Sequence, residues 1–201
     1  AIEASEFEEI TYLGYPFSIS ETFQLRNANS TIEESFERVK RIQEICTSTK
    51  KELVVYISMG FGNPYGDPYS KEIVENWIEK LSKLDINIFS LSDTVGVAQA
   101  DTIGYLFDNL IPSFPGIEFG AHLHLNATEG LKKIEAALLG GCRRFDGAIR
   151  GIGGCPMAQD DLVGNAPTEK MIELFTSKGL WSVKDERAWS QSQSLAVSLF
   201  E

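Results

Sequence analysis

The sequence has few of the residues on which disulfide frameworks, most metal sites and membrane spans depend. It contains two histidines and three cysteines among 201 residues. No apolar run approaches the roughly 20 residues that a membrane-spanning helix needs. The chain also does not open with the basic and then apolar segment of a secretory leader. These absences predict a soluble, cytoplasmic protein.

Positive charge is also scarce. Lys and Arg number 18 against 29 Asp and Glu, which gives a formal net charge of -11. Nucleic acid and anionic membranes are bound by clustered Lys and Arg, so we expect neither as a main partner. An anionic small substrate is compatible with this charge if a cation occupies the site.

The three cysteines, Cys46, Cys142 and Cys155, are an odd number and lie far apart. Their spacing fits neither a disulfide framework nor a paired-cysteine zinc site. Cys46 falls in a helical pattern and Cys142 precedes an apolar strand, so both are better explained as buried packing residues. The motifs of serine hydrolases, Walker loops and dinucleotide-binding folds are missing as well.

Apolar, β-branched runs alternate with amphipathic helical stretches, as in a parallel sheet covered by helices. Strands are expected at 9–15, 53–59, 86–92, 117–125 and 144–149. Helices are expected at about 31–47, 70–84, 100–111, 128–139 and 168–177, with a late one within 182–201. Polar helix caps are predicted at Ser30, with Glu33 three residues later, and at Ser70.

Five strand-helix units predict an α/β fold, either part of a closed TIM (β/α)8 barrel or an open doubly wound sheet. Length does not decide between them. The chain is 43% hydrophobic and shows no compositional divide, so one domain over 1–201 is expected. Residues 1–5 resemble the end of a helix, and we therefore expect the pattern to extend upstream.

Both histidines, His122 and His124, lie in the stretch Gly-Ala-His-Leu-His-Leu-Asn. Side chains alternate along a strand, so the two imidazoles should emerge on the same face. That geometry suits a metal ion, although a partly buried hydrogen-bonding pair would account for the spacing too.

In either architecture, ligands bind at the carboxyl ends of the strands. The loops there are polar and rich in glycine. The segment 151–156 reads Gly-Ile-Gly-Gly-Cys-Pro, and its glycines allow close backbone approach to an anionic ligand or, alternatively, a plain flexible connection. Cys155 adds a free thiol that could donate a proton or act as a nucleophile, depending on its pKa.

Taken together, these loops resemble the 3-hydroxy-3-methylglutaryl-CoA lyase family, whose members are metal-dependent TIM-barrel lyases. The resemblance runs from near the start of the chain to about residue 175 and implies that the chain covers about strands 4 to 8 and a C-terminal helix. It is carried by His122 and His124, 151–156 with Ala158, Gly164-Asn165 with Thr168-Glu169, Ser20-Glu21 with Phe23, Asn27, Asn29 and 32–35, Tyr56, Ser58, Gly62, Pro64 and Tyr65, and 90–91, 93–94 and 96–97.

The resemblance implies that His122, His124 and Asn165 bind a divalent cation, Mg²⁺ or Mn²⁺, for which imidazole and amide oxygen ligands are suitable. The family's fourth protein ligand is an Asp on the first barrel strand, next to a catalytic Arg, and we expect that strand to lie upstream of this sequence. One local departure is clear. Family members usually have Asp and Thr after the second His, where this chain has Leu125 and Asn126.

The implied reaction is cleavage of a 3-hydroxy-3-methylglutaryl thioester to acetyl-CoA and acetoacetate. His122 or Asp93 would relay the hydroxyl proton, Glu169 would support the site near Asn165, and Cys155 would protonate the enolate. The predicted substrate contacts are Ser20, Asn27, Ser58, Gly153 and Gly154.

Other interpretations stay open. A related aldolase or condensing enzyme acting on another acyl-CoA or a 2-oxo acid would use the same chemistry, and Leu125 and Asn126 leave room for it. A non-catalytic remnant of the fold is the other alternative, if the complete protein lacks the upstream Arg and Asp. An acyl-CoA is the expected small-molecule partner, and the resemblance allows a homodimer.

Overall fold

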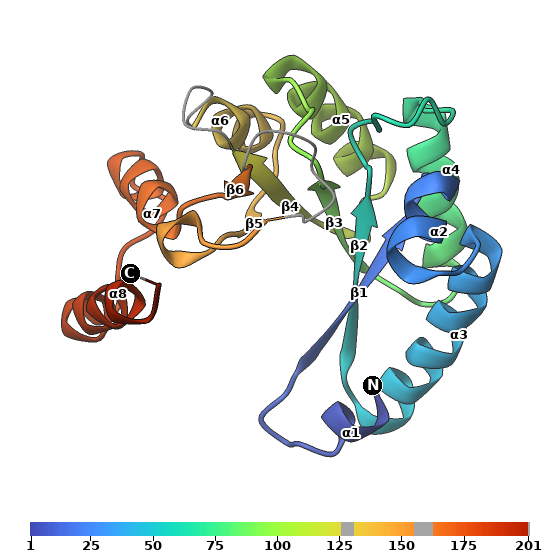
Figure 1. Ribbon diagram of the computed structural model, residues 1–201, viewed down its shortest axis with the longest axis horizontal. Coiled ribbons are helices and arrows are strands. Elements are labelled where there is room, and N and C mark those ends of the chain that lie inside the picture. The colour runs from blue at the N-terminus through green and yellow to red at the C-terminus, as the bar shows by residue number, and fades with distance from the viewer. Residues whose placement is uncertain (126–130, 155–162, 201) are drawn as a thin grey trace.

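A computed structural model describes residues 1–125, 131–154 and 163–200. The backbone alternates strands and helices around one curved sheet (Figure 1). The strands are β1 (Tyr12–Ser18), β2 (Glu52–Ser58), β3 (Ile88–Asp93), β4 (Glu118–Leu125), β5 (Arg144–Asp146) and β6 (Gly164–Asn165). The helices are α1 (Ile2–Ser5), α2 (Glu21–Ala28), α3 (Ile32–Thr49), α4 (Lys71–Ser82), α5 (Ala100–Ser113), α6 (Lys132–Leu139), η1 (Ile149–Gly151), α7 (Thr168–Ser177) and α8 (Glu186–Phe200).

The strand order settles the choice between barrel and open sheet. β1 to β5 lie side by side in chain order, and each neighbouring pair is parallel. A doubly wound sheet reverses its order at a switch point, whereas a barrel adds each strand beside the last. The helices of the strand-helix units lie on the outside of the curve and leave its inner face open (Figure 1). The chain therefore forms an α/β arc of the barrel type.

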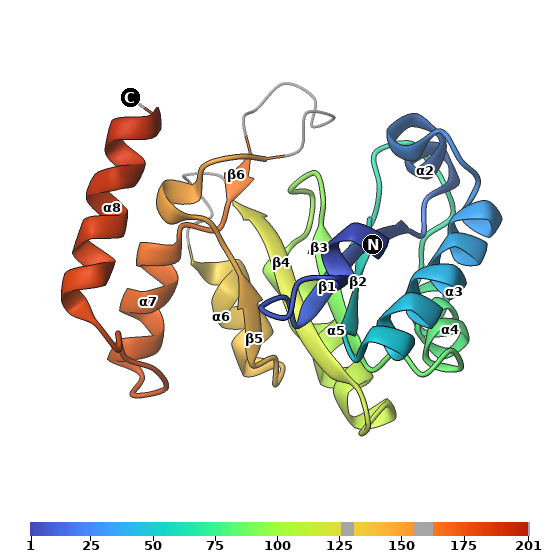
Figure 2. The same cartoon turned by 90° about the horizontal axis from the view of Figure 1, so that it is seen from below.

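The two ends of the arc carry different helices. Figure 2 shows α7 and α8 together at one end of the molecule, beyond β5, and α3 and α4 together at the opposite end. The helices thus follow one another around the arc in the same order as the strands that they cover.

One row of residues across the sheet explains how the helices are held. Phe17, Ile57, Leu91, Ala121 and Phe145 are paired in register from β1 to β5. The first four are buried in the hydrophobic core that the helices complete. Burying one such large apolar side chain contributes about 1.5–3 kcal/mol. This outward row anchors the sheet to its helices.

The neighbouring row points the other way, because side chains alternate along each strand. Ser18 is paired with Ser58, and Ser92 is paired with His122, which is paired in turn with Asp146. A polar row on the inner face of the sheet is therefore placed at the carboxyl ends of the strands.

Most predicted elements are confirmed within a few residues, and α7 matches its predicted bounds. The strand predicted at 9–15 was wrong by three residues, because the chain continues through Pro16 to Ser18. Pro16 stays within the strand, where it is paired in register with Tyr56 of β2. The strand predicted at 144–149 ends earlier, at Asp146.

The cap predicted at Ser30 was also wrong. Thr31 caps α3, and its hydroxyl and the Glu34 side chain form the reciprocal capping box. Ser70 caps α4 as predicted, accepting from the Ile73 N–H. The short helix α2 and the two-residue strand β6 were not predicted. Within the described residues, no helix is long and apolar enough to cross a membrane.

Candidate active site

The two histidines lie together on the inner face of β4, as the alternation predicts. Their ring centroids are 5.3 Å apart in a T-shaped arrangement. β6 runs antiparallel to the end of β4 and places Asn165 opposite His124 in register. The fold thus brings together the three side chains that the sequence nominated as metal ligands, although they come from two strands about 40 residues apart.

A backbone carbonyl orients His124. Its Nδ1 lies 2.8 Å from the carbonyl oxygen of Thr94, in the turn after β3. Since a carbonyl can only accept, Nδ1 carries the proton and Nε2 keeps the lone pair in the neutral ring. The ring therefore presents a ligand nitrogen on its other side, where the Asn165 side chain is within hydrogen-bonding reach.

His122 has a different environment. Tyr56 from β2 packs edge-on against its ring, with centroids 5.6 Å apart. Its buried Nδ1 has no hydrogen-bond partner among the described residues and lies 3.9 Å from Oδ2 of Asp146. That carboxylate in turn accepts from the Ser90 hydroxyl at 3.1 Å. Asp146 is thus a site residue that the sequence reasoning missed, although a carboxylate ending a strand in alternation with Arg144 was a usable signal.

Burial keeps both imidazoles neutral. It lowers the pKa of His122 below its ordinary value of 6.5, and the nearby His124 lowers it further, while Asp146 opposes the shift. Burial likewise lowers the pKa of His124, against the opposing effects of the Thr94 carbonyl and the Asp93 charge. Neutral imidazole is the form that binds a metal ion.

The glycine-rich segment is fitted against Asn165. The Asn165 side-chain amide donates to the Ile152 carbonyl at 2.9 Å, and its backbone N–H donates to the Gly153 carbonyl at 3.3 Å. Gly153 has a φ of +89°, and a Cβ added at Gly154 would lie 2.3 Å from the Val163 carbonyl oxygen. Close backbone approach is therefore what these two glycines supply here. Cys155, the predicted proton donor, lies outside the described residues.

Asp93 lies on the other side of its strand. In register it is paired with Leu123, next to the Ser92–His122 pair, so its side chain points away from the inner face. Its carboxylate forms an ion pair with Lys133 of α6 at 2.9 Å and accepts from the Ala98 N–H at 3.0 Å. Lys133 gave no signal in the sequence, where it reads as one more helix-surface lysine.

The remaining predicted residues are spread along the strand ends. Ser20 is fully buried, accepts from the Phe23 N–H and donates to Asp67, so it serves as the cap of α2. Ser58 ends β2 on the inner face, and Asn27 is exposed near the end of α2. Glu169, at the start of α7, accepts from the Arg150 N–H at 2.9 and 3.0 Å and holds the turn that leads into the glycine segment.

These residues fit a divalent cation. Two neutral imidazoles and an amide oxygen converge, and a buried ring nitrogen of one of them lacks a partner among the described residues. No group of three or more His, Cys, Asp and Glu side chains converges as a metal site within 1–125, 131–154 and 163–200. Asn165, placed opposite His124 in register, is the further side chain at this position that could contribute an oxygen ligand.

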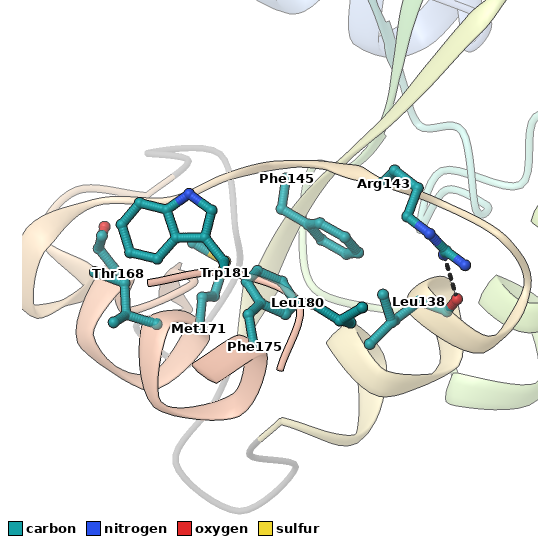
Figure 3. Close-up of a pocket in the computed structure, with 9 residues that line it drawn as sticks. Leu138, Arg143, Phe145, Thr168, Met171, Phe175, Leu180 and Trp181 are labelled. Atoms are coloured by element: carbon teal, nitrogen blue, oxygen red, sulfur yellow. Dashed lines mark hydrogen bonds between the residues drawn. The ribbon is translucent and has the colours of Figure 1, made fainter. Parts of the chain in front are cut away.

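An apolar cavity lies elsewhere in the described part of the chain. It has a volume of about 380 Å³ and is lined by apolar side chains such as Phe145, Met171 and Trp181 (Figure 3). Phe145 belongs to the outward row, so the cavity lies on the opposite face of β5 from Asp146. Its one guanidinium, from Arg143, already donates to the Leu138 and Cys142 carbonyls at 2.9 and 2.8 Å. The candidate active site is therefore the inner, polar face.

Comparison with known proteins identifies a family. Residues 11–193 match the family model described as HMGL-like. The chain is 30% identical over 172 residues to the hydroxymethylglutaryl-CoA lyase of Pseudomonas mevalonii, covering 86% of this chain and 57% of that protein. It is 32% identical to the hydroxymethylglutaryl-CoA lyase of Bacillus subtilis, covering 79% and 52%. The chain thus spans little more than half the length of these relatives.

Among solved structures, the hydroxymethylglutaryl-CoA lyase of Pseudomonas aeruginosa superposes with a TM-score of 0.87 at 27% identity, covering 99% of this chain and 66% of that one. An HMG-CoA lyase from Acinetobacter baumannii, in complex with coenzyme A and 3-methylmalate, gives a TM-score of 0.83 at 28% identity, covering 94% and 61%.

Proposed function

This chain belongs to the HMGL-like family, and we propose that it forms the metal-binding part of a carbon–carbon lyase acting on a 3-hydroxy-3-methylglutaryl thioester. The observation that carries the proposal is the convergence of His122, His124 and Asn165 on the inner face of the sheet. We also propose that residues 1–201 are strands 4 to 8 of a single barrel domain, and that the complete protein is cytoplasmic.

The proposed ligands are these three side chains, and the cation is Mg²⁺ or Mn²⁺. A bound divalent ion would polarise the hydroxyl and carbonyl oxygens of the substrate. The protein's part is to hold the ligands in place. The Thr94 carbonyl sets the tautomer of His124, and Ile152 holds the amide of Asn165.

The reaction requires one proton to leave the substrate and one to return. Loss of the C3 hydroxyl proton lets the C3 oxygen become the carbonyl of acetoacetate as the C2–C3 bond breaks. The electron pair of that bond passes to the acetyl thioester as its enolate, and protonation at C2 gives acetyl-CoA. Cys155, next to Gly154 in the sequence, is the proposed donor of that last proton.

The first proton is assigned to His122. Asp146, 3.9 Å from its Nδ1, would stabilise the imidazolium that forms. The Asp93 carboxylate is engaged by Lys133 and by the Ala98 N–H, which leaves His122 as the better placed of the two predicted bases. Glu169 keeps a supporting role, through the turn at Arg150.

The proposed substrate contacts are Asn27, Ser58, Gly153 and Gly154, with Ser20 acting through the cap of α2. Coenzyme A is present in one of the related structures, and a CoA thioester is the partner that we propose for this chain. The homodimer remains a prediction.

The two roles assigned to His122, ligand and base, compete for one imidazole. The His122→Ala variant of the complete protein distinguishes the ligand role from the base role. A ligand role predicts loss of Mn²⁺ binding, measured by electron paramagnetic resonance. A role as base alone predicts that Mn²⁺ binding survives while turnover is lost.

The test of the function itself is metal-dependent release of acetoacetate from the thioester by the complete protein. We expect release with Mg²⁺ or Mn²⁺ and none after chelation. A protein that binds the ion but does not cleave this thioester would contradict the proposed substrate, and one that binds no ion would contradict the site.

A second candidate has one observation in its favour. Leu125, 7% exposed at the end of β4, stands where the resembled family usually has Asp. A changed side chain at a strand end favours a changed substrate, so a related acyl-CoA or 2-oxo acid aldolase or condensing enzyme is the alternative. Assay of a small panel of thioesters and 2-oxo acids distinguishes the two.

A further inference from the structure

We propose that Lys133 is a positioning residue that holds the metal ligand His124 in its binding orientation through a buried ion pair with Asp93. The inference deepens the proposed metal site and rests on it. Lys133 belongs to α6 on the outside of the sheet, and among the described residues it contacts His124 at the backbone carbonyl. Its influence must pass through the backbone.

The ammonium group of Lys133 is buried in a cluster of oxygen atoms. The side chains of Lys133 and Asp93 are 2% and 1% exposed. Lys133 Nζ lies 2.9 Å from Asp93 Oδ2, 3.0 Å from the Gly96 carbonyl oxygen and 3.4 Å from the His124 carbonyl oxygen. One cation thus joins the end of β3, the turn after it and the end of β4.

The turn at residues 93–98 connects the Lys133–Asp93 ion pair to the ring of His124. Asp93 Oδ1 accepts from the Ala98 N–H at 3.0 Å, and Lys133 binds the Gly96 carbonyl between them. Thr94 lies in the same turn, and its carbonyl oxygen is the acceptor for His124 Nδ1. Lys133 therefore fixes both the backbone of His124 and the group that sets its tautomer.

The opposite side of the turn is also packed. The Thr94 hydroxyl accepts from the Met59 N–H at 2.9 Å. Gly96 has a φ of +73°, and a Cβ there would lie 2.5 Å from a methyl of Val163, two residues before Asn165. A shift of this turn would disturb both His124 and the strand that carries Asn165.

Stability alone is a weak reason for such a pair. The free-energy cost of removing two charges from water offsets most of the attraction between them. Proteins in which apolar side chains of similar volume replace a buried ion pair are often as stable as the original. An ion pair imposes direction and distance, which an apolar contact does not. Precise placement of the turn is what the Lys133–Asp93 pair supplies.

The test compares Lys133→Met/Asp93→Asn with the wild type and with Lys132→Met in the complete protein. The double variant removes both charges of the buried pair, and the amide oxygen that it introduces at position 93 can still accept from the Ala98 N–H. Lys132 is the exposed neighbour on α6 and serves as the matched control. Lys133→Gln, which is neutral but can still donate to Gly96, provides a milder second variant in case the double variant does not fold.

Two measurements are made on each protein. The first is Mn²⁺ affinity by electron paramagnetic resonance, where loss of a supporting contact is expected to weaken binding by about 10–100-fold. The second is the tautomer of His124 by ¹⁵N NMR in the presence of a chelator, assigned with a His124→Gln sample. We expect the Nδ1-protonated form in the wild type and in Lys132→Met, and a mixture of tautomers in the double variant, with Lys133→Gln between them.

The proposal is overturned if the variants keep the single tautomer and bind Mn²⁺ within about twofold of the wild type, well inside the 10–100-fold range expected for a supporting contact. Failure of the proposed function gives a different result, because the wild type would then bind no Mn²⁺. In that case the tautomer, measured without metal, still decides whether Lys133 positions His124.

Discussion

His124 and Thr94 are joined by a contact of 2.8 Å between Nδ1 of the ring and the carbonyl oxygen. The ring comes from β4, whereas the carbonyl comes from the turn after β3. The turn after β3 therefore determines which ring nitrogen of His124 is left to bind a metal ion. Orientation of a ligand by such an outer contact is a common feature of metal sites, and it makes the site sensitive to changes that touch no ligand.

Removal of either imidazole should abolish tight metal binding. We expect His122→Ala and His124→Ala each to weaken Mn²⁺ binding by at least about 100-fold, since outer contacts alone are worth 10–100-fold. Titration followed by electron paramagnetic resonance measures this. Asp108→Asn, an exposed change on α5, should bind Mn²⁺ like the wild type. Wild-type Mn²⁺ affinity in both histidine variants would show that neither histidine is a metal ligand.

Asp146 should tune His122 without binding the ion itself. Its carboxylate lies 3.9 Å from His122 Nδ1 and is held by Ser90. We expect Asp146→Asn to weaken Mn²⁺ binding by about 10–100-fold and to lower kcat, because the site loses a negative charge beside His122. Equal affinity and kcat in this variant would show that the carboxylate plays no part in the site.

The glycine segment should not tolerate a side chain at Gly154. A Cβ there would lie 2.3 Å from the Val163 carbonyl oxygen, so the two backbones must separate and Asn165 must move. We expect Gly154→Ala to lower the free energy of unfolding by about 1–3 kcal/mol and to weaken Mn²⁺ binding. Gly116→Ala, where a Cβ meets nothing within 4 Å, is the control. Urea unfolding and Mn²⁺ titration of the two variants should therefore differ.

Cys155 should act in turnover and not in metal binding. If it donates the final proton, Cys155→Ser should lower kcat by about 10²–10⁴-fold while Mn²⁺ affinity stays at the wild-type value. Cys46→Ala, which changes a buried thiol of α3, should keep its kcat. A Cys155→Ser enzyme with wild-type kcat would exclude the acid role.

Alkylation offers an independent check of the same residue. Burial raises the pKa of the Cys46 thiol and raises the pKa of Cys142 to about 12, so both should react slowly with iodoacetamide near neutral pH. Inactivation accompanied by modification of one thiol would then point to Cys155, and peptide mapping identifies it. Rapid modification of Cys142 would contradict the burial on which this reasoning rests.

Stability should fall at alkaline pH through Tyr69. Burial, aided by the Asp93 charge, raises the pKa of the Tyr69 phenol to about 12 from an ordinary value of 10.0. Between these values the unfolded chain has lost the proton that the folded chain keeps, so the free energy of unfolding decreases as pH rises through that window. Tyr69→Phe should reduce this decrease, as measured by urea unfolding at about pH 9 and about pH 11, on either side of the ordinary phenol pKa. Tyr12→Phe, at an exposed tyrosine, is the matched control, and equal slopes in the two variants would contradict the prediction.

Pro16 and Thr31 show where local patterns mislead. Pro16 suggests a break in the strand because proline has no backbone N–H to donate, yet β1 runs through it and pairs it in register with Tyr56 of β2. Ser30 and Thr31 are both good caps, and the choice between them depends on tertiary contacts. The Ser30 hydroxyl instead accepts a hydrogen bond from the side-chain amide of Gln24 at 3.2 Å.

The sequence by itself determined the order of strands and helices and the placement of His122 and His124 on one face, because side-chain periodicity is a local property of the backbone. It also nominated Asn165, through the resemblance. The resemblance likewise predicted the barrel, and the strand order confirms it. Only the tertiary structure decided the side of β3 on which Asp93 lies and the contacts of Asp146 and Lys133 with the histidines. Those depend on which strands become neighbours and on which residues face one another across them, and no local pattern encodes that register.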